Sequence, residues 1–267
     1  MEHIHRFGVL LRTGIPRLVL ALVLAVSGCS RPSQSTERTA PRGPSGVAAG
    51  AFPAPSRPVA EIVTDTWSDE DTRDRAGEAE RVMELLAVRP GMQVADIGAG
   101  SGYYTVRLAA RVAPGGEVIA QDIIPRYLEQ LRGRVEREGL TNVTFVLGEP
   151  HDPRLPESSV ELALLVHMYH EVEQPYGLLY NLYPALLPGA RVAVVDLDRP
   201  TQRHGTPPAL LRCEVAAVGY REVAFHELGE GSGYLAVFAP PPSRAERPEP
   251  AAMRSCPAGE APQARQE

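Results

Sequence analysis

Lysine is missing from this 267-residue sequence, so all 27 of its basic residues are arginines. The 33 acidic residues outnumber these arginines, and the net charge is −6. Residues 1–28 carry a net charge of +2, which leaves −8 for the remainder. An acidic chain without a basic stripe repels phosphate backbones. We therefore expect no nucleic-acid partner, and nothing in the sequence indicates a protein partner.

Cysteine is scarce as well, with only Cys29, Cys213 and Cys256. Their spacing fits no metal-ligand motif and does not indicate a disulfide framework. Cys213 falls in an expected helix and is interpreted as a small apolar packing residue. The apolar run over residues 18–26 is too short for a membrane span, which needs about 20 residues.

The first 29 residues are typical of an export signal. Three arginines precede the apolar run, which ends in Val26-Ser27-Gly28-Cys29. Small residues directly before a cysteine resemble the bacterial lipobox, in which the signal peptidase cuts before the cysteine and its thiol is lipidated. A cleaved signal without lipid, or an inner-membrane anchor, is the alternative. The resemblance implies a protein held on the periplasmic side of the cell envelope by a lipid on Cys29.

Two segments of biased composition flank the middle of the chain. Residues 30–60 are rich in Pro, Ser, Gly and Ala without an apolar period, which is typical of a flexible tether. Residues 241–267 are interpreted in the same way, as a disordered tail. We expect a single domain over residues 61–240 and no chemistry in either flanking segment.

Strands alternate with helices through this domain. Strands are expected over residues 93–97, 117–122, 142–147, 160–168, 190–196, 221–226 and 233–238, and helices over 68–87, from the turn after 97 to 112, and over 125–138, 174–187 and 207–218. The alternation predicts right-handed βαβ units and a parallel sheet covered on both faces. The final two strands are close enough to pair as an antiparallel hairpin. We predict an α/β, Rossmann-like, doubly wound fold whose seven-stranded sheet is mostly parallel, with an antiparallel last strand.

The most informative motif is the run VADIGAGSG at residues 94–102, in which a strand leads into a glycine-rich turn and a helix. Gly98, Gly100 and Gly102 follow Asp96 in the spacing G-x-G-x-G, which differs from the dinucleotide fingerprint G-x-G-x-x-G. Glycines let the backbone bend and approach a ligand where a Cβ would clash. The run resembles motif I of class I S-adenosylmethionine-dependent methyltransferases. The resemblance implies that Asp96 orients the loop and that the glycines lie against the methionine part of the cofactor.

Two further acids extend this prediction. Asp122 ends the second strand, where a carboxylate accepts hydrogen bonds from both ribose hydroxyls of a nucleoside. The resemblance also implies an acid near the adenine amino group in the loop after the third strand. Asp152 is the candidate for this contact, and Glu149 is the alternative.

The sequence His167-Met-Tyr-His-Glu171 closes the fourth strand, and ligands of open α/β sheets lie at the carboxyl ends of strands. His170 is the candidate catalytic acid or base, because an imidazole titrates near neutral pH. The alternative is that His170 and Glu171 only support the following helix. A metal site is disfavoured, since this spacing does not place two ligands on one helical face as H-E-x-x-H does.

From residue 67 to 189 the chain resembles small bacterial methyltransferases akin to the ubiquinone/menaquinone methylases. The resemblance rests on residues 94–104, on DPRLP at 152–156 and on LLPG at 186–189. The glycine motif also looks like that of protein isoaspartate methyltransferases, but the substrate loop of that family is not found upstream. The resemblance implies methyl transfer from S-adenosylmethionine to an unidentified small or lipophilic acceptor.

Two alternatives differ in chemistry from this one. A non-catalytic envelope lipoprotein would use a methyltransferase-like pocket only to bind a ligand. A nicotinamide-dependent oxidoreductase is disfavoured by the glycine spacing and the final antiparallel pair. The leader conflicts with the cofactor, because S-adenosylmethionine is made in the cytoplasm and the leader directs the domain out of it.

Overall fold

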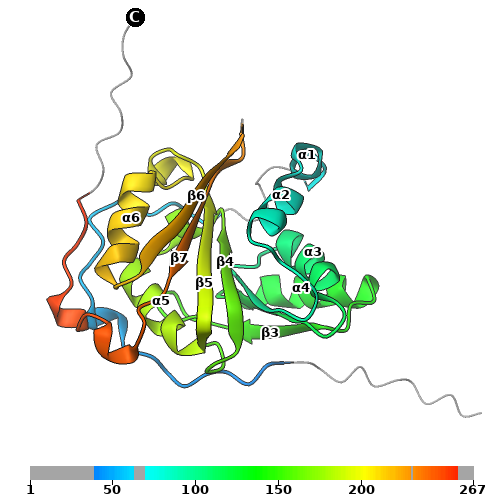
Figure 1. The fold of residues 1–267 in the computed structure, drawn as a ribbon, viewed down its shortest axis with the longest axis horizontal. Helices are drawn as coiled ribbons and strands as arrows, with labels where there is room; N and C mark the ends of the chain where they lie inside the picture. Colours follow the sequence, from blue (N-terminus) through cyan, green and yellow to red (C-terminus); the bar gives the residue numbers. More distant parts are fainter. Residues whose placement is uncertain (1–38, 63–69, 230, 258–267) are drawn as a thin grey trace, which may run out of the picture. The chain divides into compact units, whose positions relative to one another are not determined.

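Strands and helices alternate along the chain in the computed structural model, which describes residues 39–62, 70–229 and 231–257 (Figure 1). The strands are β1 (Gln93–Ile97), β2 (Glu117–Asp122), β3 (Val143–Leu147), β4 (Val160–Val166), β5 (Leu186–Asp196), β6 (Arg221–Gly229) and β7 (Gly233–Ala239). The α-helices are α1 (Glu70–Ala76), α2 (Glu78–Leu85), α3 (Tyr103–Val112), α4 (Pro125–Arg137), α5 (Pro175–Leu182) and α6 (Pro208–Ala217). Short 3-10 turns are η1 (Ala49–Ala51), η2 (Tyr169–Glu171), η3 (Tyr183–Ala185), η4 (Thr201–Arg203), η5 (Arg244–Glu246) and η6 (Pro250–Ala252).

The seven strands form one sheet in the order β3-β2-β1-β4-β5-β7-β6. Strands β1 to β5 pair in parallel, and β7 runs antiparallel to both β5 and β6. The predicted Rossmann-like fold and its antiparallel last strand are therefore confirmed. The chain reverses its winding direction between β1 and β4, and ligands of open α/β sheets bind at this switch point, beyond the carboxyl ends of the strands.

Side chains alternate along each strand between two apolar cores, one on each face of the sheet. Val94 and Leu164 belong to the core that packs against α2, α3 and α4, whereas their neighbours Ala95 and Leu165 belong to the core beneath α5 and α6. Figure 1 shows these two helix groups on opposite sides of the sheet. Burial on both faces explains why the central strands read as continuous apolar runs.

Two helices differ from their expected bounds. The single helix expected over residues 68–87 is divided into α1 and α2 at Gly77, whose φ of +66° is left-handed and interrupts the helix. The helix expected to reach residue 187 ends at Leu182, because Pro184 has no N–H to continue the ladder. Strand β5 begins four residues earlier than predicted.

The expectation of a flexible tether is wrong for residues 39–60, which pack against the domain. Phe52 and Arg57 are buried, and the Gly46 N–H donates a 2.8 Å hydrogen bond to the Asp152 carboxylate. The ring of Phe52 meets that of Tyr180 edge to face at 5.4 Å. Few apolar residues suffice here, because Ala40 and Phe52 enter a core that the domain already provides.

The tail prediction is also wrong for residues 241–257, and so is the prediction of no disulfide. Cys213 in α6 is bonded to Cys256, whose side chain is buried. The Cys256 N–H donates to the Tyr176 hydroxyl at 2.8 Å, and Met253 joins the core beneath α5 and α6. The expected leader and Cys29 lie outside the described residues. Among the residues that the structure describes, no helix combines the length and apolarity that a membrane span requires.

Candidate active site

A cavity of about 820 Å³ opens at the carboxyl ends of β1, β2 and β4, next to the switch point. Its walls include the glycine loop after β1, the end of β2, the loop after β3 and residues 166–168 after β4. Residues 59–62, the first two of which end the segment predicted to be a tether, also contribute, together with Glu70 and Arg73 of α1. The volume is in the usual range for a cofactor or small-molecule site, about 300–1,000 Å³.

The glycine loop has the conformation that its sequence predicts. Gly98 and Gly100 both have positive φ, +69° and +52°, which side-chain-bearing residues rarely adopt. A Cβ on Gly98 would lie 3.0 Å from the side chain of Met168. Both glycines line the cavity, but Gly102 is not among the described residues that do. Its Cβ would fall 2.1 Å from Leu131 Cδ1, so Gly102 serves the packing of α3 on α4.

Asp96 and Asp122 both line the cavity and are buried. The Asp96 carboxylate accepts a 2.6 Å hydrogen bond from the Thr105 hydroxyl, and burial raises its pKa to about 6. Asp122 accepts 2.9 Å hydrogen bonds from the Gly100 and Ile124 N–H groups. Burial also raises the pKa of Asp122, against the effect of those donors. Asp122 thus holds the glycine loop onto the end of β2.

The acid predicted to meet adenine is placed elsewhere. The Asp152 carboxylate accepts the N–H groups of Gly46 and Arg154, and Asp152 is not among the described residues that line the cavity. It ties residues 39–62 to the loop after β3. The alternative, Glu149, does line the cavity together with Pro150. The sequence alone did not show which of these two acids, three residues apart in one loop, lies in the cavity.

His170 is also not brought to the cavity wall. It is 1% exposed, and its Nδ1 lies 3.0 Å and 3.1 Å from the two carboxylate oxygens of Asp196 at the end of β5. Its neighbours His167, Met168 and Glu171 line the cavity instead. The 3-10 turn η2 accounts for this difference, because it buries His170 and leaves Glu171 partly exposed at the cavity.

A largely buried charged network beside the glycine loop was not predicted from the sequence. Glu78 at the start of α2 accepts a 2.6 Å hydrogen bond from Arg73 and a 3.1 Å bond from the Tyr104 hydroxyl, and lies 3.2 Å from His167 Nε2. Burial would raise the pKa of Glu78, but His167 and Arg73 outweigh it and lower that pKa to about 2. The guanidinium of Arg73 lies 3.9 Å from the ring centre of Tyr103. No motif or spacing in the sequence indicates this network.

Acidic side chains make up most of the charged residues in the described lining of the cavity. They are Glu61, Glu70, Asp96, Asp122, Glu149, Glu171 and Glu173. Arg73 is the single arginine among these lining residues. Walls of one sign raise the local concentration of oppositely charged ligands. The cavity therefore suits a ligand that carries positive charge, and a nucleoside with a sulfonium group meets that requirement.

Comparison with known proteins agrees with this geometry. Residues 94–189 match the model of a family described as a methyltransferase domain. Over these residues the chain is similar to class I S-adenosylmethionine-dependent methyltransferases. The ubiquinone/menaquinone biosynthesis C-methyltransferase UbiE of Ectopseudomonas mendocina is 31% identical over 119 residues, which are 44% of this chain and 46% of that protein. The chain spans about half or less of the length of such curated relatives.

Solved structures share the fold of this methyltransferase domain at lower identity. A SAM-dependent methyltransferase from Aquifex aeolicus is 22% identical and superimposes with a TM-score of 0.56 over 64% of this chain and 97% of that one. The [4+2]-cyclase SpnF is 15% identical, with a TM-score of 0.54 over 66% of this chain and 68% of its own. The family implies S-adenosylmethionine as the cofactor. The second likeness shows that the fold alone does not determine the chemistry.

Proposed function

We propose that the chain binds S-adenosylmethionine in this cavity and transfers its methyl group to a small or lipophilic acceptor. The placement of Asp122 carries the proposal. This buried carboxylate ends β2 inside the cavity and also holds the glycine loop, so one side chain orders the loop and faces the ligand. A carboxylate at that position accepts hydrogen bonds from ribose hydroxyls.

The remaining walls fit the other parts of the cofactor. Gly98 and Gly100 are suited to the methionine portion, because both line the cavity and neither has a side chain to keep a ligand away from the backbone. Glu149 is suited to the adenine amino group, in the place first assigned to Asp152. When bound, S-adenosylmethionine would supply an electrophilic methyl group on a positively charged sulfur. The protein's part is to align the reactants and exclude water from between them.

Calorimetric titration of S-adenosylmethionine into the full-length, oxidised chain tests the cofactor site. The variant is Asp122→Asn, which keeps the size of the side chain. Asp152→Asn is a matched control, because both acids are buried and accept two backbone N–H groups, but only Asp122 lines the cavity. We expect Asp122→Asn to weaken binding by about tenfold or more, for the loss of a charge-assisted hydrogen bond.

Two results would contradict the proposal. One is the absence of binding by the folded wild-type chain at millimolar cofactor. The other is an equal loss of affinity in both variants, which would attribute the effect to general destabilisation. Binding without release of S-adenosylhomocysteine across a panel of acceptors would favour the alternative of a ligand-binding lipoprotein. The shared fold of the [4+2]-cyclase supports keeping that alternative in the test.

We further propose that the protein is exported and held in the envelope by a lipid on Cys29. The disulfide between Cys213 and Cys256 supports export, because such bonds persist mainly in oxidising compartments. Labelling with a fatty acid in a Gram-negative host should mark the wild-type chain and not a Cys29→Ala variant. The thiols of Cys213 and Cys256 should resist alkylation before reduction. Unlabelled protein in the cytoplasm with reactive thiols would contradict both parts.

A further inference from the structure

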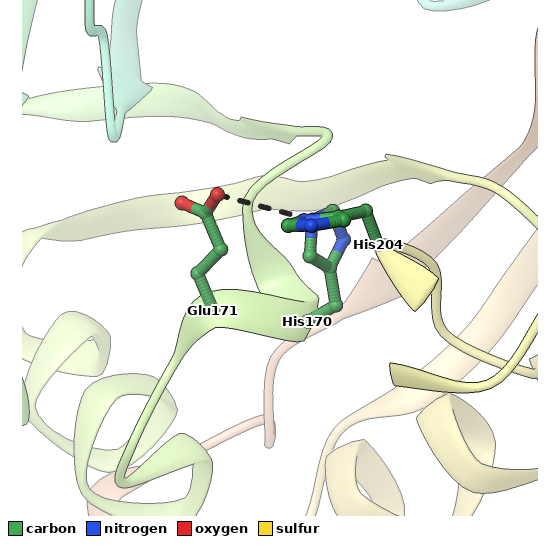
Figure 2. Close-up of side chains that lie close together, drawn as sticks. All are labelled: His170, Glu171 and His204. Carbon is green, nitrogen blue, oxygen red and sulfur yellow. Dashed lines mark ion pairs between the residues drawn. The ribbon is translucent and has the colours of Figure 1, made fainter. Parts of the chain in front are cut away.

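Three side chains with metal-binding atoms meet beside the cavity, and only one of them lines it. His170 and Glu171 come from η2, and His204 follows η4, which lies after β5. One ligand atom from each of the three lies within 4.8 Å of the other two. Figure 2 shows the carboxylate of Glu171 pointing toward the two imidazole rings. Its Oε1 lies 4.0 Å from His170 Nε2.

The imidazole of His170 is oriented by a second carboxylate. Asp196 is fully buried and accepts hydrogen bonds from the Leu197 N–H at 2.8 Å and the Thr206 hydroxyl at 2.7 Å. Its remaining contact is His170 Nδ1, which must donate because an ionised carboxylate only accepts. The coordinating nitrogen of this tautomer is Nε2, on the side of Glu171 and His204. Metal-bound histidines are commonly held in this way by a carboxylate on the other nitrogen.

His204 is held in position by its backbone. Its φ of +56° is unusual for a residue with a side chain, and its N–H donates to the Thr201 carbonyl at 3.0 Å. The Thr201 hydroxyl in turn donates to the Pro58 carbonyl at 2.7 Å. The rings of His204 and His170 stand nearly perpendicular, at 86°, with centres 5.5 Å apart. Strained backbone of this kind persists where the surrounding structure enforces it, often at functional sites.

We propose that His170, His204 and Glu171 form a binding site for a divalent transition-metal ion of the zinc class. Two imidazole nitrogens and one carboxylate oxygen are a donor set of catalytic zinc sites, which keep a fourth position for water or substrate. Bonds of about 2.0–2.1 Å to a tetrahedral ion place ligand atoms roughly 3.3–3.5 Å apart. The observed 4.0 Å between His170 Nε2 and Glu171 Oε1, and the separations of up to 4.8 Å within the cluster, would have to close by about 0.5–1.5 Å around an ion.

The place of the ion suggests what it does. Glu171 lines the cavity, as does Met168 at the Gly98 turn, so the open position would face the space between the glycine loop and β4. An ion there would bind an oxygen atom of the methyl acceptor and favour its ionised form. This role rests on the proposed methyl transfer, whereas binding of the ion does not. It makes the acceptor a hydroxyl or enol compound.

Titration with Co²⁺ tests the site without any turnover. The full-length, oxidised chain is used without a polyhistidine tag, and the visible absorption of the bound ion reports its coordination. We expect one ion per chain, with the intense bands of four-coordinate Co²⁺, displaced by one equivalent of Zn²⁺. His204→Gln and Glu171→Gln should each weaken binding by about tenfold or more. Asp196→Asn should weaken it by about 10–100-fold, as a partner of a metal ligand does.

His226→Gln is the matched control, because His226 is a partly buried histidine on β6 outside the cluster. It should bind Co²⁺ as the wild type does. Circular dichroism shows whether each variant is folded, and His204→Gln is informative even if Asp196→Asn unfolds, since His204 is partly exposed. No Co²⁺ absorption from the wild type, or equal binding by wild type and His204→Gln, would overturn the metal site.

A second titration tests whether the bound ion has an open position for the methyl acceptor, separately from whether the ion binds at all. Acetohydroxamate, a small oxygen chelator, is added to the Co²⁺-loaded protein. We expect the absorption bands to shift as the open position is filled. Unchanged bands would show a closed, structural ion and overturn the role in acceptor binding. Calorimetry with S-adenosylmethionine on the same variants reports the proposed cofactor site independently, because Asp122 and the glycine loop lie outside this cluster.

Discussion

Replacement of Glu78 by Gln should destabilise the fold in a strongly pH-dependent manner. Glu78 is 5% exposed, and its carboxylate faces Arg73 at 2.6 Å and His167 at 3.2 Å. Burial opposes ionisation, yet the two partners lower the pKa to about 2 from its ordinary 4.5. A difference of roughly 2.5 pKa units corresponds to about 3 kcal/mol of stability at neutral pH. Glutamine keeps the shape but leaves the partly buried cation of Arg73 without its counter-charge, a loss that is destabilising.

The sign of the pH dependence follows from the lowered pKa. The stabilisation by Glu78 is complete above the unfolded-state pKa near 4.5 and is lost as the pH falls toward about 2. The free energies of unfolding of the wild type and the Glu78→Gln variant should therefore differ by about 3 kcal/mol at pH 7 and converge by pH 2.

Guanidinium unfolding at a series of pH values measures this difference. Glu80→Gln on the same helix is the control, because Glu80 is largely exposed where it pairs with Arg111. Exposed pairs contribute about 0–1 kcal/mol, so this variant should remain close to the wild type at every pH. A Glu78→Gln variant as stable as Glu80→Gln at pH 7, or a gap that does not narrow in acid, would refute the reasoning.

Three further perturbations have definite outcomes. The raised pKa of Asp96, about 6, means that its favourable contribution is present below pH 3.8 and is lost as the pH rises through 6. The unfolding free energy of the wild type, measured with urea, should therefore fall by about 2–3 kcal/mol more between pH 4 and 7 than that of Asp96→Asn. Gly102→Ala should cost about 1–2 kcal/mol more than Gly91→Ala, since both have strongly positive φ but only Gly102 would place a Cβ against Leu131. Equal melting temperatures of the two would contradict this. Cys213→Ser, which removes a disulfide spanning 43 residues, should lower the unfolding free energy by about 2–4 kcal/mol, and no change under oxidising conditions would count against it.

Predictions from the sequence were correct where neighbouring residues alone determine the backbone conformation. The turn at Gly98 and Gly100 requires positive φ, and glycine is the residue type that adopts positive φ most readily. Asp122 was also placed correctly, because the end of a strand neighbouring the glycine turn must lie beside it in a parallel sheet. The family likeness and the cofactor prediction both depend on this short, locally determined unit.

Predictions failed where a side chain's direction depends on distant contacts. The choice between Asp152 and Glu149 is decided by the backbone of Gly46, more than 100 residues away. The 3-10 turn after β4 likewise decides that Glu171 rather than His170 meets the cavity. Neither contact leaves a periodic signal in the sequence. The ion pair between Glu78 and Arg73 was missed for the same reason, since the break at Gly77 brings these residues together.

The prediction of a disordered tail failed for a similar reason, because contacts with distant residues hold residues 241–257 in place. Low apolar content predicts disorder because such a segment cannot bury enough surface by itself. Residues 241–257 need not do so, because Cys256 is covalently attached to α6 and Met253 enters a core that the domain already provides. The composition of a segment shows how much apolar surface the segment has. It does not show which contacts the rest of the domain offers to that segment.

Arg57 extends this argument from the fold to the site. Its guanidinium is 1% exposed and pairs with the equally buried Glu214 of α6 at 2.9 Å. The same guanidinium donates to the backbone carbonyls of Tyr169 and Val172 at 3.2 Å and 3.3 Å, which flank His170 and Glu171. A residue of the segment expected to be a tether thus fixes the turn that carries two of the three proposed metal ligands. Because residues 59–62 also line the cavity, the segment before the methyltransferase domain belongs to the site that the domain forms.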